Sequence, residues 1–144
     1  MEITISDNKI ESGKQAAKRG AELVRAAIAA RGNSTIIVAT GASQFEILEA
    51  LVAEPDIDWS VVTCFHLDEY VSIPITHRAS FRRYLWERFV SKLPLPLKAF
   101  HYLDAEVDPE LECARVGELI AQESVDVAFI GIGENGHVAF NDPP

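Results

Sequence analysis

Apolar residues along the chain recur at two different spacings, and the alternation of these spacings predicts alternating helices and strands. Between positions 10 and 31, four apolar residues fall on one helical face, and Gly32-Asn33 follows as a typical helix end. These four residues are Ala17, Ala21, Val24 and Ile28. Positions 35–39 form a continuous, mostly β-branched run instead, which favours a parallel strand buried on both faces.

The rest of the chain continues this alternation. We expect strands at 2–5, 61–67, 99–103 and 125–130, the second and the last of them buried, and helices beginning near Ser43, Ser80 and Asp108-Pro109. Because helices separate the strands, the sheet should be mainly parallel with helices on both faces. No repeat, low-complexity tract or linker interrupts residues 1–144, so we expect a single domain. No helix follows the last strand to cover the sheet there. We therefore expect a Rossmann-like α/β three-layer sandwich that is truncated at its C-terminus.

Composition limits the partners of the protein. The 144 residues include 13 basic and 22 acidic ones, which gives a formal net charge of -9. A chain this acidic lacks the basic surface that binds nucleic acid, and an anionic substrate would have to be held by local donors. No apolar stretch reaches the length of a membrane span, and the N-terminus lacks the pattern of a signal peptide. We expect a cytoplasmic protein with neither nucleic acid nor membrane as a partner.

The cysteines and histidines give no indication of a metal site. Cys64 falls in a predicted strand and Cys113 in a predicted helix, and we expect both to be buried free thiols rather than a disulfide or a redox pair. The four histidines show no metal-ligand spacing, so we expect no metal.

Candidate chemistry lies in three loops that follow predicted strands. In the first, Thr40-Gly41-Ala42-Ser43, the glycine permits a tight turn, and free N–H groups at the helix start could bind an anion together with the Ser43 hydroxyl. The alternative is a capping box, with Ser43 as the N-cap and Glu46 three residues on. In the second loop, Asp68 and Glu69 could supply the general base for isomerising a sugar, or could lie in a solvated turn.

The third loop contains His137, which can transfer protons near neutral pH, with Asp142 or Glu134 to orient its ring. A structural histidine is the alternative. The same loop spells G-x-G-x-x-G, the dinucleotide fingerprint, at Gly131, Gly133 and Gly136. That fingerprint requires a helix to open at its last glycine. The Asn141-Asp142 pair and two prolines follow here, and they stop a helix, so we do not expect a nicotinamide or flavin site.

Together the three loops resemble a known family. The segment Gly131-x-Gly-x-Asn-Gly-His137-x-Ala-Phe-Asn-Asp-Pro143 is similar to the signature of the glucosamine-6-phosphate deaminase/isomerase family. Phe65-His-Leu-Asp-Glu-Tyr-Val71 resembles its Asp-Glu-Tyr segment, and Ala39-Thr-Gly-Ala-Ser43 its phosphate loop. The resemblance runs from about Lys14 to the end of the chain, with the motifs in the family's order.

The resemblance implies conversion of glucosamine 6-phosphate and water to fructose 6-phosphate and ammonia, without a cofactor. Asp68 would move a proton between C1 and C2 of the open-chain sugar, and His137 would assist ring opening. The implied catalytic residues are Asp68, His137, Asn135, Asp142 and Glu69, and the implied phosphate-binding residues are Thr40, Gly41, Ala42, Ser43 and Gly136. The partner would be a phosphorylated amino sugar, and the family often forms homo-oligomers.

Three departures from the family pattern leave the substrate open. Asn135 stands where the family usually has aspartate, Asp142 where it has glutamate, and Gln44-Phe45 where it tends to have threonine and proline. An amide can hold an imidazole by a hydrogen bond but cannot stabilise an imidazolium as a charge would. Two alternatives remain: a relative of 6-phosphogluconolactonase, and a non-catalytic sensor of sugar phosphates.

Overall fold

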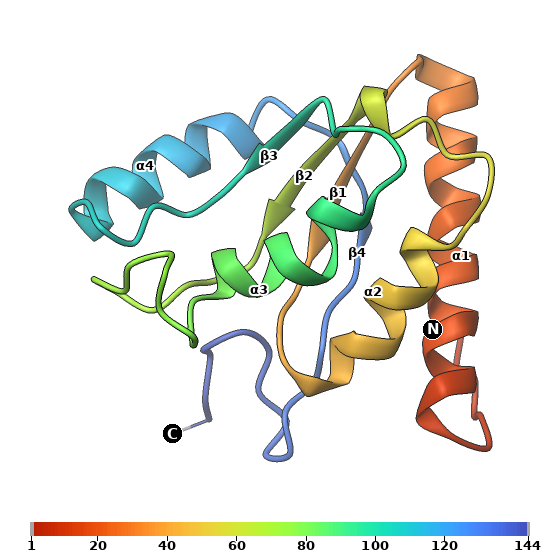
Figure 1. Cartoon of the computed structure of the whole chain (residues 1–144), viewed down its shortest axis with the longest axis horizontal. Helices are drawn as coiled ribbons and strands as arrows, with labels where there is room; N and C mark the ends of the chain where they lie inside the picture. Colours follow the sequence, from red (N-terminus) through yellow and green to blue (C-terminus); the bar gives the residue numbers. More distant parts are fainter. Residues whose placement is uncertain (1, 144) are drawn as a thin grey trace.

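Four parallel strands form one sheet: β1 (Ser34–Val38), β2 (Val62–His66), β3 (Ala99–His101) and β4 (Val125–Ala128). The computed structural model describes residues 2–143, and Met1 and Pro144, the two ends of the expected domain, lie outside the described residues (Figure 1). The strand order is β3-β2-β1-β4, and Ile36 of β1 pairs with Cys64 of β2 and with Val127 of β4. The mainly parallel sheet expected from the sequence is confirmed.

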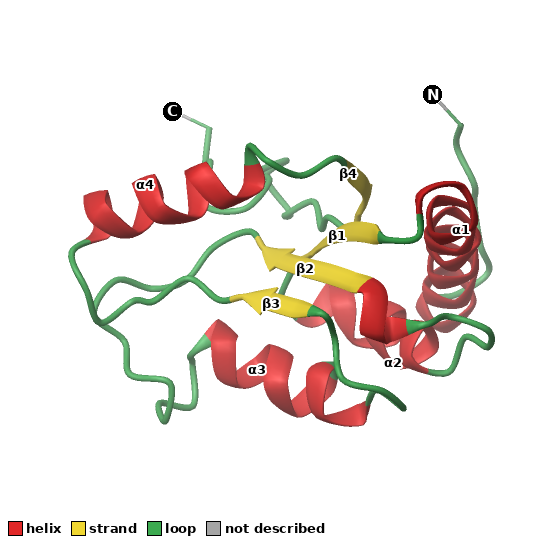
Figure 2. Cartoon of the chain, turned by 90° about the horizontal axis from the view of Figure 1, so that it is seen from above, coloured by secondary structure: helices red, strands yellow, loops and turns green. Residues whose placement is uncertain are grey.

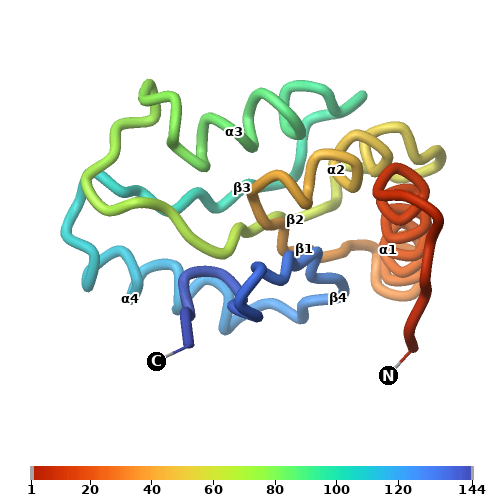
Figure 3. The backbone as a smooth tube through the Cα atoms, turned by 90° about the horizontal axis from the view of Figure 1, so that it is seen from below, coloured from red at the N-terminus to blue at the C-terminus, as the bar shows by residue number. Residues whose placement is uncertain are grey.

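Helices cover both faces of this sheet, as expected. The helices are α1 (Lys9–Arg31), α2 (Phe45–Val52), α3 (Phe81–Arg88) and α4 (Pro109–Ile120), with short 3-10 helices η1 (Ala42–Gln44), η2 (Trp59–Val61) and η3 (Val90–Lys92). Figure 2 shows α2 and α3 on one face of the sheet and α4 on the opposite face. Helix α1 packs beside α2 and against β1 and β4. Figure 3 shows the C-terminal segment on the same side of the sheet as α4.

The helix ends follow the predicted local signals. Gly32 ends α1 with a φ of 78°, a left-handed conformation that glycine adopts without strain. The Ser80 hydroxyl accepts a hydrogen bond from the Arg83 N–H at the start of α3 (3.3 Å). The Asp108 carboxylate accepts from the N–H groups of Glu110 and Leu111 (3.0 and 3.1 Å) at the start of α4. These starts confirm the positions predicted for both helices.

The main core lies between the sheet and helices α1 to α3. It is built from buried apolar side chains of all these elements: Ala17, Ala21, Val24, Ile36, Val38, Leu48, Leu51, Trp59, Val62, Cys64, Leu85, Phe89 and Phe129. Small residues let α1 pack closely against Phe129, the residue that follows β4, since a Cβ at Gly20 would lie 2.2 Å from Cζ of Phe129. This packing fixes the carboxyl end of β4, and therefore the start of the loop that carries His137.

Two strand predictions differ from the structure. Residues 2–5 form no strand, and Ile3 and Ile5 are 72% and 93% exposed, because no neighbouring strand of the described chain pairs with this segment. Strand β4 ends at Ala128, and it is not buried as predicted: Val125 is 40% exposed. The reason is that β4 lies at the edge of the sheet and pairs with β1 alone among the described strands.

One cysteine prediction was also wrong. Both thiols are free and Cys64 is buried, as expected, but Cys113 is exposed. On α4 the neighbouring Glu112 points inward instead, where its carboxylate accepts from the Asp104 N–H (2.7 Å) and pairs with Arg115.

Within residues 2–143 no helix has the length and apolarity that a membrane span requires. The same residues contain no group of three or more histidine, cysteine or acidic side chains placed to hold a metal.

Candidate active site

A cavity of about 240 Å³ lies at the carboxyl ends of the parallel strands, where α/β sheets usually bind ligands. The loops that follow β1, β2 and β4 all contribute to its walls. Its polar or glycine lining consists of Thr40, Gly41, Ser43, Asp68, Gly131, Gly133 and His137, and its apolar lining of Ala39, Leu67, Phe81, Ile132, Ala139 and Phe140. Residues from the three loops singled out in the sequence therefore meet at one place.

The loop after β1 turns tightly at Gly41 before it enters η1. Gly41 has a φ of 100°, and its carbonyl accepts hydrogen bonds from the Tyr84 hydroxyl (2.9 Å) and the Gln44 N–H (3.1 Å). The first N–H groups of a helix have no acceptor within that helix, so the start of η1 offers free donors next to the cavity. Ser43 lines the cavity, whereas Ala42 does not.

The alternative interpretation of Ser43 as part of a capping box is not found. The 3-10 helix begins after Gly41, which places Ser43 inside the turn rather than at its cap. Glu46 instead forms an ion pair with Lys9 across the α1–α2 contact (2.8 Å). The Ser43 hydroxyl is therefore not used to cap a helix.

Asp68, in the loop after β2, has the properties of a general base. It is half-buried and lines the cavity, and its carboxylate has no hydrogen-bond or ion-pair partner within residues 2–143. Burial, assisted by the nearby negative charge of Glu69, raises the pKa of Asp68 above its ordinary value. A carboxylate with a raised pKa accepts a proton more readily, which suits it to abstract a proton from carbon.

Glu69 has a different position from the one its predicted catalytic role requires. Its side chain is 2% exposed and does not line the cavity. The carboxylate accepts hydrogen bonds from the Ser80 hydroxyl (2.8 Å) and from the N–H groups of Tyr70, Phe81 and Arg82 (3.0, 3.0 and 2.9 Å). Burial would raise the pKa of Glu69, but these donors together lower it below its ordinary value. Glu69 thus joins the Asp68 loop to the start of α3.

His137 is held by Asn135 and Asp142, two of the residues that depart from the family pattern. Its Nδ1 atom lies 2.5 Å from Oδ1 of Asn135 and 3.3 Å from Oδ1 of Asp142. The Asn135 amide nitrogen also donates to the Asp142 carboxylate (2.9 Å), which fixes the orientation of the amide. Because both partners of Nδ1 are acceptors, this nitrogen carries the proton of the neutral ring, and Nε2 is left unprotonated for proton transfer. Glu134 makes no hydrogen bond to the ring in the described chain.

The glycines of this segment allow close packing rather than binding of a dinucleotide. A Cβ at Gly133 would lie 2.2 Å from Cε1 of His137, and one at Gly131 would lie 2.7 Å from Oγ of Ser43. Gly136 has a φ of 86° and does not line the cavity. No helix opens at Gly136, because residues 131–143 form turns and an isolated bridge between Val138 and Asn141. The geometry therefore differs from that of a dinucleotide fingerprint.

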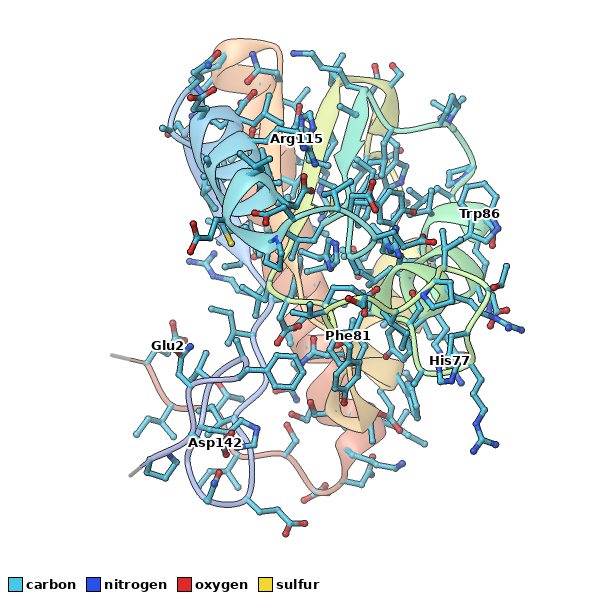
Figure 4. All side chains as sticks on the ribbon, turned by 90° about the vertical axis from the view of Figure 1, so that its left-hand side faces the viewer. Glu2, His77, Phe81, Trp86, Arg115 and Asp142 are labelled. Carbon is cyan, nitrogen blue, oxygen red and sulfur yellow. The ribbon has the colours of Figure 1, made fainter. Side chains whose placement is uncertain are left out.

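Sequence reasoning missed an aromatic cluster at the mouth of the cavity. The rings of Tyr70, Phe81 and Phe140 have centroids 5.0 to 5.9 Å apart, and Phe81 and Phe140 are stacked. Figure 4 labels Phe81 at the start of α3 and Asp142 in the C-terminal segment. Phe81 is half-buried and lines the cavity. Its place as the first residue of α3 was the signal that could have revealed this.

Comparisons with known proteins show the family of this chain. The profile of the family described as "Glucosamine-6-phosphate isomerases/6-phosphogluconolactonase" matches residues 7–140. The chain is 36% identical to a glucosamine-6-phosphate deaminase of Bacillus cytotoxicus over 135 residues, which cover 93% of this chain and 50% of that protein. It is 32% identical to a glucosamine-6-phosphate deaminase of Listeria monocytogenes over 143 residues, covering 99% of this chain and 58% of that protein.

Solved structures share the fold at lower identity. A monomeric glucosamine-6-phosphate deaminase superimposes with a TM-score of 0.88 at 23% identity, covering 99% of this chain and 60% of that one. The 6-phosphogluconolactonase of Thermotoga maritima superimposes with a TM-score of 0.80 at 22% identity, covering 95% and 62%. The chain thus spans about half to three fifths of the length of these relatives. By its profile match and its curated relatives, the chain belongs to the glucosamine-6-phosphate isomerase/6-phosphogluconolactonase family.

Proposed function

We propose that the full-length protein containing this chain converts glucosamine 6-phosphate and water to fructose 6-phosphate and ammonia. One observation carries this proposal: Asp68 and His137 line the same cavity as the turn at Gly41 and Ser43, to which we assign anion binding. An aldose-to-ketose conversion needs a base at carbon, a proton-transfer group at oxygen and a hold on the remote phosphate. We assign these three roles to Asp68, to His137 and to the turn at Gly41 and Ser43.

The reaction would begin with ring opening. The unprotonated Nε2 of His137 accepts the proton of the anomeric hydroxyl and returns it to the ring oxygen, which yields the open-chain aldehyde. Asn135 and Asp142 keep the ring in the tautomer that this step needs. We therefore assign Asn135 and Asp142 to orienting His137 rather than to contact with the sugar.

Asp68 would then perform the isomerisation. Its carboxylate removes the proton from C2 and returns it to C1, and the substrate's ammonium group gives a proton to O1. These transfers convert the amino aldehyde through an enolamine to an iminium at C2. Water adds to that iminium and ammonia leaves, which gives the ketone. The chemistry draws on the substrate's own carbonyl and amine, so the proposal includes no cofactor.

The phosphate would be held by the first loop. Ser43, Thr40 and the backbone at Gly41 are the groups of this loop that line the cavity, and we assign phosphate binding to them. Ala42 and Gly136 do not line the cavity, so we assign them no part in phosphate binding. Glu69 is assigned a positioning role for the Asp68 loop.

A second candidate is hydrolysis of 6-phosphogluconolactone, since the family includes such enzymes and His137 could activate a water molecule. Asp68 with a raised pKa is the observation that favours the deaminase, because lactone hydrolysis needs no proton removal from carbon.

The deciding experiment uses the full-length protein. Ammonia and fructose 6-phosphate are measured with glucosamine 6-phosphate as substrate, and acid release is measured with 6-phosphogluconolactone. Turnover of the amino sugar supports the proposal. Turnover of the lactone alone would replace the proposal with the hydrolase. Binding of glucosamine 6-phosphate without turnover of either compound would identify a sensor.

A further inference from the structure

Gln44 is a buried polar residue that the proposed mechanism does not use. It is 1% exposed and is the last residue of η1, directly before α2, whose Leu48 and Leu51 are fully buried. Its Nε2 atom donates to Oγ of Ser43 (3.3 Å), and its Oε1 atom has no hydrogen-bond partner among the described residues. Leaving a buried amide oxygen unpaired costs about 1–3 kcal/mol. Folding alone therefore favours an apolar residue at this position.

The hydrogen bond from Gln44 fixes how Ser43 can bind a ligand. A serine hydroxyl has one proton to donate and two lone pairs to accept with. Because Gln44 donates to this oxygen, the hydroxyl proton of Ser43 must point elsewhere. Ser43 lines the cavity, so its proton is available to an anion there.

The backbone of Gly131 packs closely against the Ser43 hydroxyl and the Gln44 amide. A Cβ at Gly131 would lie 2.7 Å from Oγ of Ser43 and 3.2 Å from Nε2 of Gln44. The amide is thus packed where the anion-binding turn meets the segment that leads to His137. A longer side chain at position 131 would separate the two loops.

The direction of the Ser43 hydroxyl matters because no lysine or arginine lines this cavity among residues 2–143. The chain also carries a net charge of -9, so no general attraction favours an anion. Only neutral donors remain in the described lining, and a hydroxyl that turned its lone pair toward a phosphate would repel it.

We propose that Gln44 is a positioning residue that commits the Ser43 hydroxyl to donate to the phosphate of the substrate. This inference rests on the proposed function, in which the first loop binds that phosphate. It gives a role to a residue at which the chain departs from the threonine typical of the family.

The test is a double-mutant cycle in the full-length protein, with Gln44→Met, Ser43→Ala and the double variant. Gln44→Met keeps the length of the side chain and removes its hydrogen bonds. Calorimetric titration with inorganic phosphate should show an affinity loss of about tenfold for each single variant, and no further loss in the double variant. With glucosamine 6-phosphate, KM should rise by a similar factor while kcat changes less than threefold. Gln15→Met, on the exposed surface of α1, is the matched control and should change neither value.

Three results would overturn the inference: wild-type affinity in Gln44→Met, losses that multiply in the double variant, or no phosphate binding by the wild type. A purely structural role would lower the melting temperature and kcat without the coupling to Ser43. If Gln44→Met does not fold, Gln44→Glu replaces it. A carboxylate can only accept from Ser43, so this variant should lose more than tenfold in phosphate affinity, and retained affinity would refute the proposal. Phosphate binding with normal coupling but no turnover would leave this inference intact and reject the proposed reaction.

Discussion

The Nδ1 atom of His137 lies 2.5 Å from the Oδ1 atom of Asn135, so an amide orients the imidazole at a position where a carboxylate was expected. The amide reproduces the geometry of that contact without its charge. Asp142 supplies a negative charge slightly farther away, at 3.3 Å. The site thus divides orientation and charge between two residues.

This division predicts the effect of changing Asn135. Asn135→Leu should lower kcat by about 10²-fold, because the ring loses the contact that fixes its tautomer. Asn135→Asp should retain activity, because a carboxylate oxygen can accept from Nδ1 as the amide oxygen does. Both effects are measured as ammonia release at pH 7 in the full-length protein. Wild-type kcat in Asn135→Leu would show that this contact does not orient His137 for catalysis.

Asp68→Asn should change catalysis and stability in opposite directions. The variant should lose at least about 10³-fold in kcat and lose exchange of the C2 proton with solvent, because the amide cannot accept that proton. Unchanged exchange would remove Asp68 from the mechanism. The raised pKa of Asp68 also means that its ionised carboxylate lowers the free energy of unfolding, because the folded state disfavours the charged form. The variant should therefore be more stable than the wild type at pH 7, and this gain should vanish as the pH falls below about 3.9, the value for an unfolded aspartate.

Glu69→Gln tests the link between the Asp68 loop and α3. In this variant an amide NH2 group replaces one carboxylate oxygen and would face an N–H group, so that two donors meet without an acceptor. The variant should therefore lose about 2 kcal/mol in the free energy of unfolding at pH 7. Glu87→Gln, which breaks an exposed pair with Arg83 on the same helix, is the control and should cost about 0.5 kcal/mol or less.

The pH dependence of Glu69 has the opposite sign from that of Asp68. Its pKa is lowered in the folded state, so its contribution is present above about pH 4.3, the value for an unfolded glutamate, and is lost as the pH falls through the lowered folded value. Urea unfolding of wild type and Glu69→Gln should therefore converge in acid. A constant difference from pH 7 down to pH 3 would contradict this assignment.

Phe140 and Trp86 form a matched pair for testing the aromatic cluster. They are 51% and 54% exposed, but Phe140 contacts Tyr70 and Phe81 at the cavity. Phe140→Ala should raise KM and lower kcat, together about tenfold in kcat/KM, because the loop that carries His137 loses its contact with α3. Trp86→Ala should leave kcat/KM unchanged. Equal losses in the two variants would point to a general effect on folding instead.

The predictable parts of this molecule are those that depend on neighbours in the sequence. Ser80 and Asp108 mark helix starts because a cap bonds to N–H groups two or three residues ahead. The grouping of Asp68, Ser43 and His137 could also be predicted from the sequence, because parallel strands bring their carboxyl ends to one edge of the sheet. The buried position of Glu69 could not be predicted, because the groups that donate hydrogen bonds to its carboxylate follow a loop of irregular structure. The inward turn of Glu112 in place of Cys113 likewise depends on Asp104 and Arg115, which only the fold brings together.

Gly133 gives the sharpest test of why the closing segment is rich in glycine. Its backbone lies against the His137 ring, with 2.2 Å from a built Cβ to Cε1, so Gly133→Ala should displace the imidazole and lower kcat by about 10²-fold. Thermal unfolding should change little, because the segment lies outside the main core. Gly117→Ala is the matched control: it lies within α4 with nothing within 4 Å of its built Cβ, and alanine there should stabilise the protein by about 0.5–1 kcal/mol without changing kcat. If Gly133→Ala kept wild-type kcat, the close approach of this glycine to the ring would have no role in catalysis.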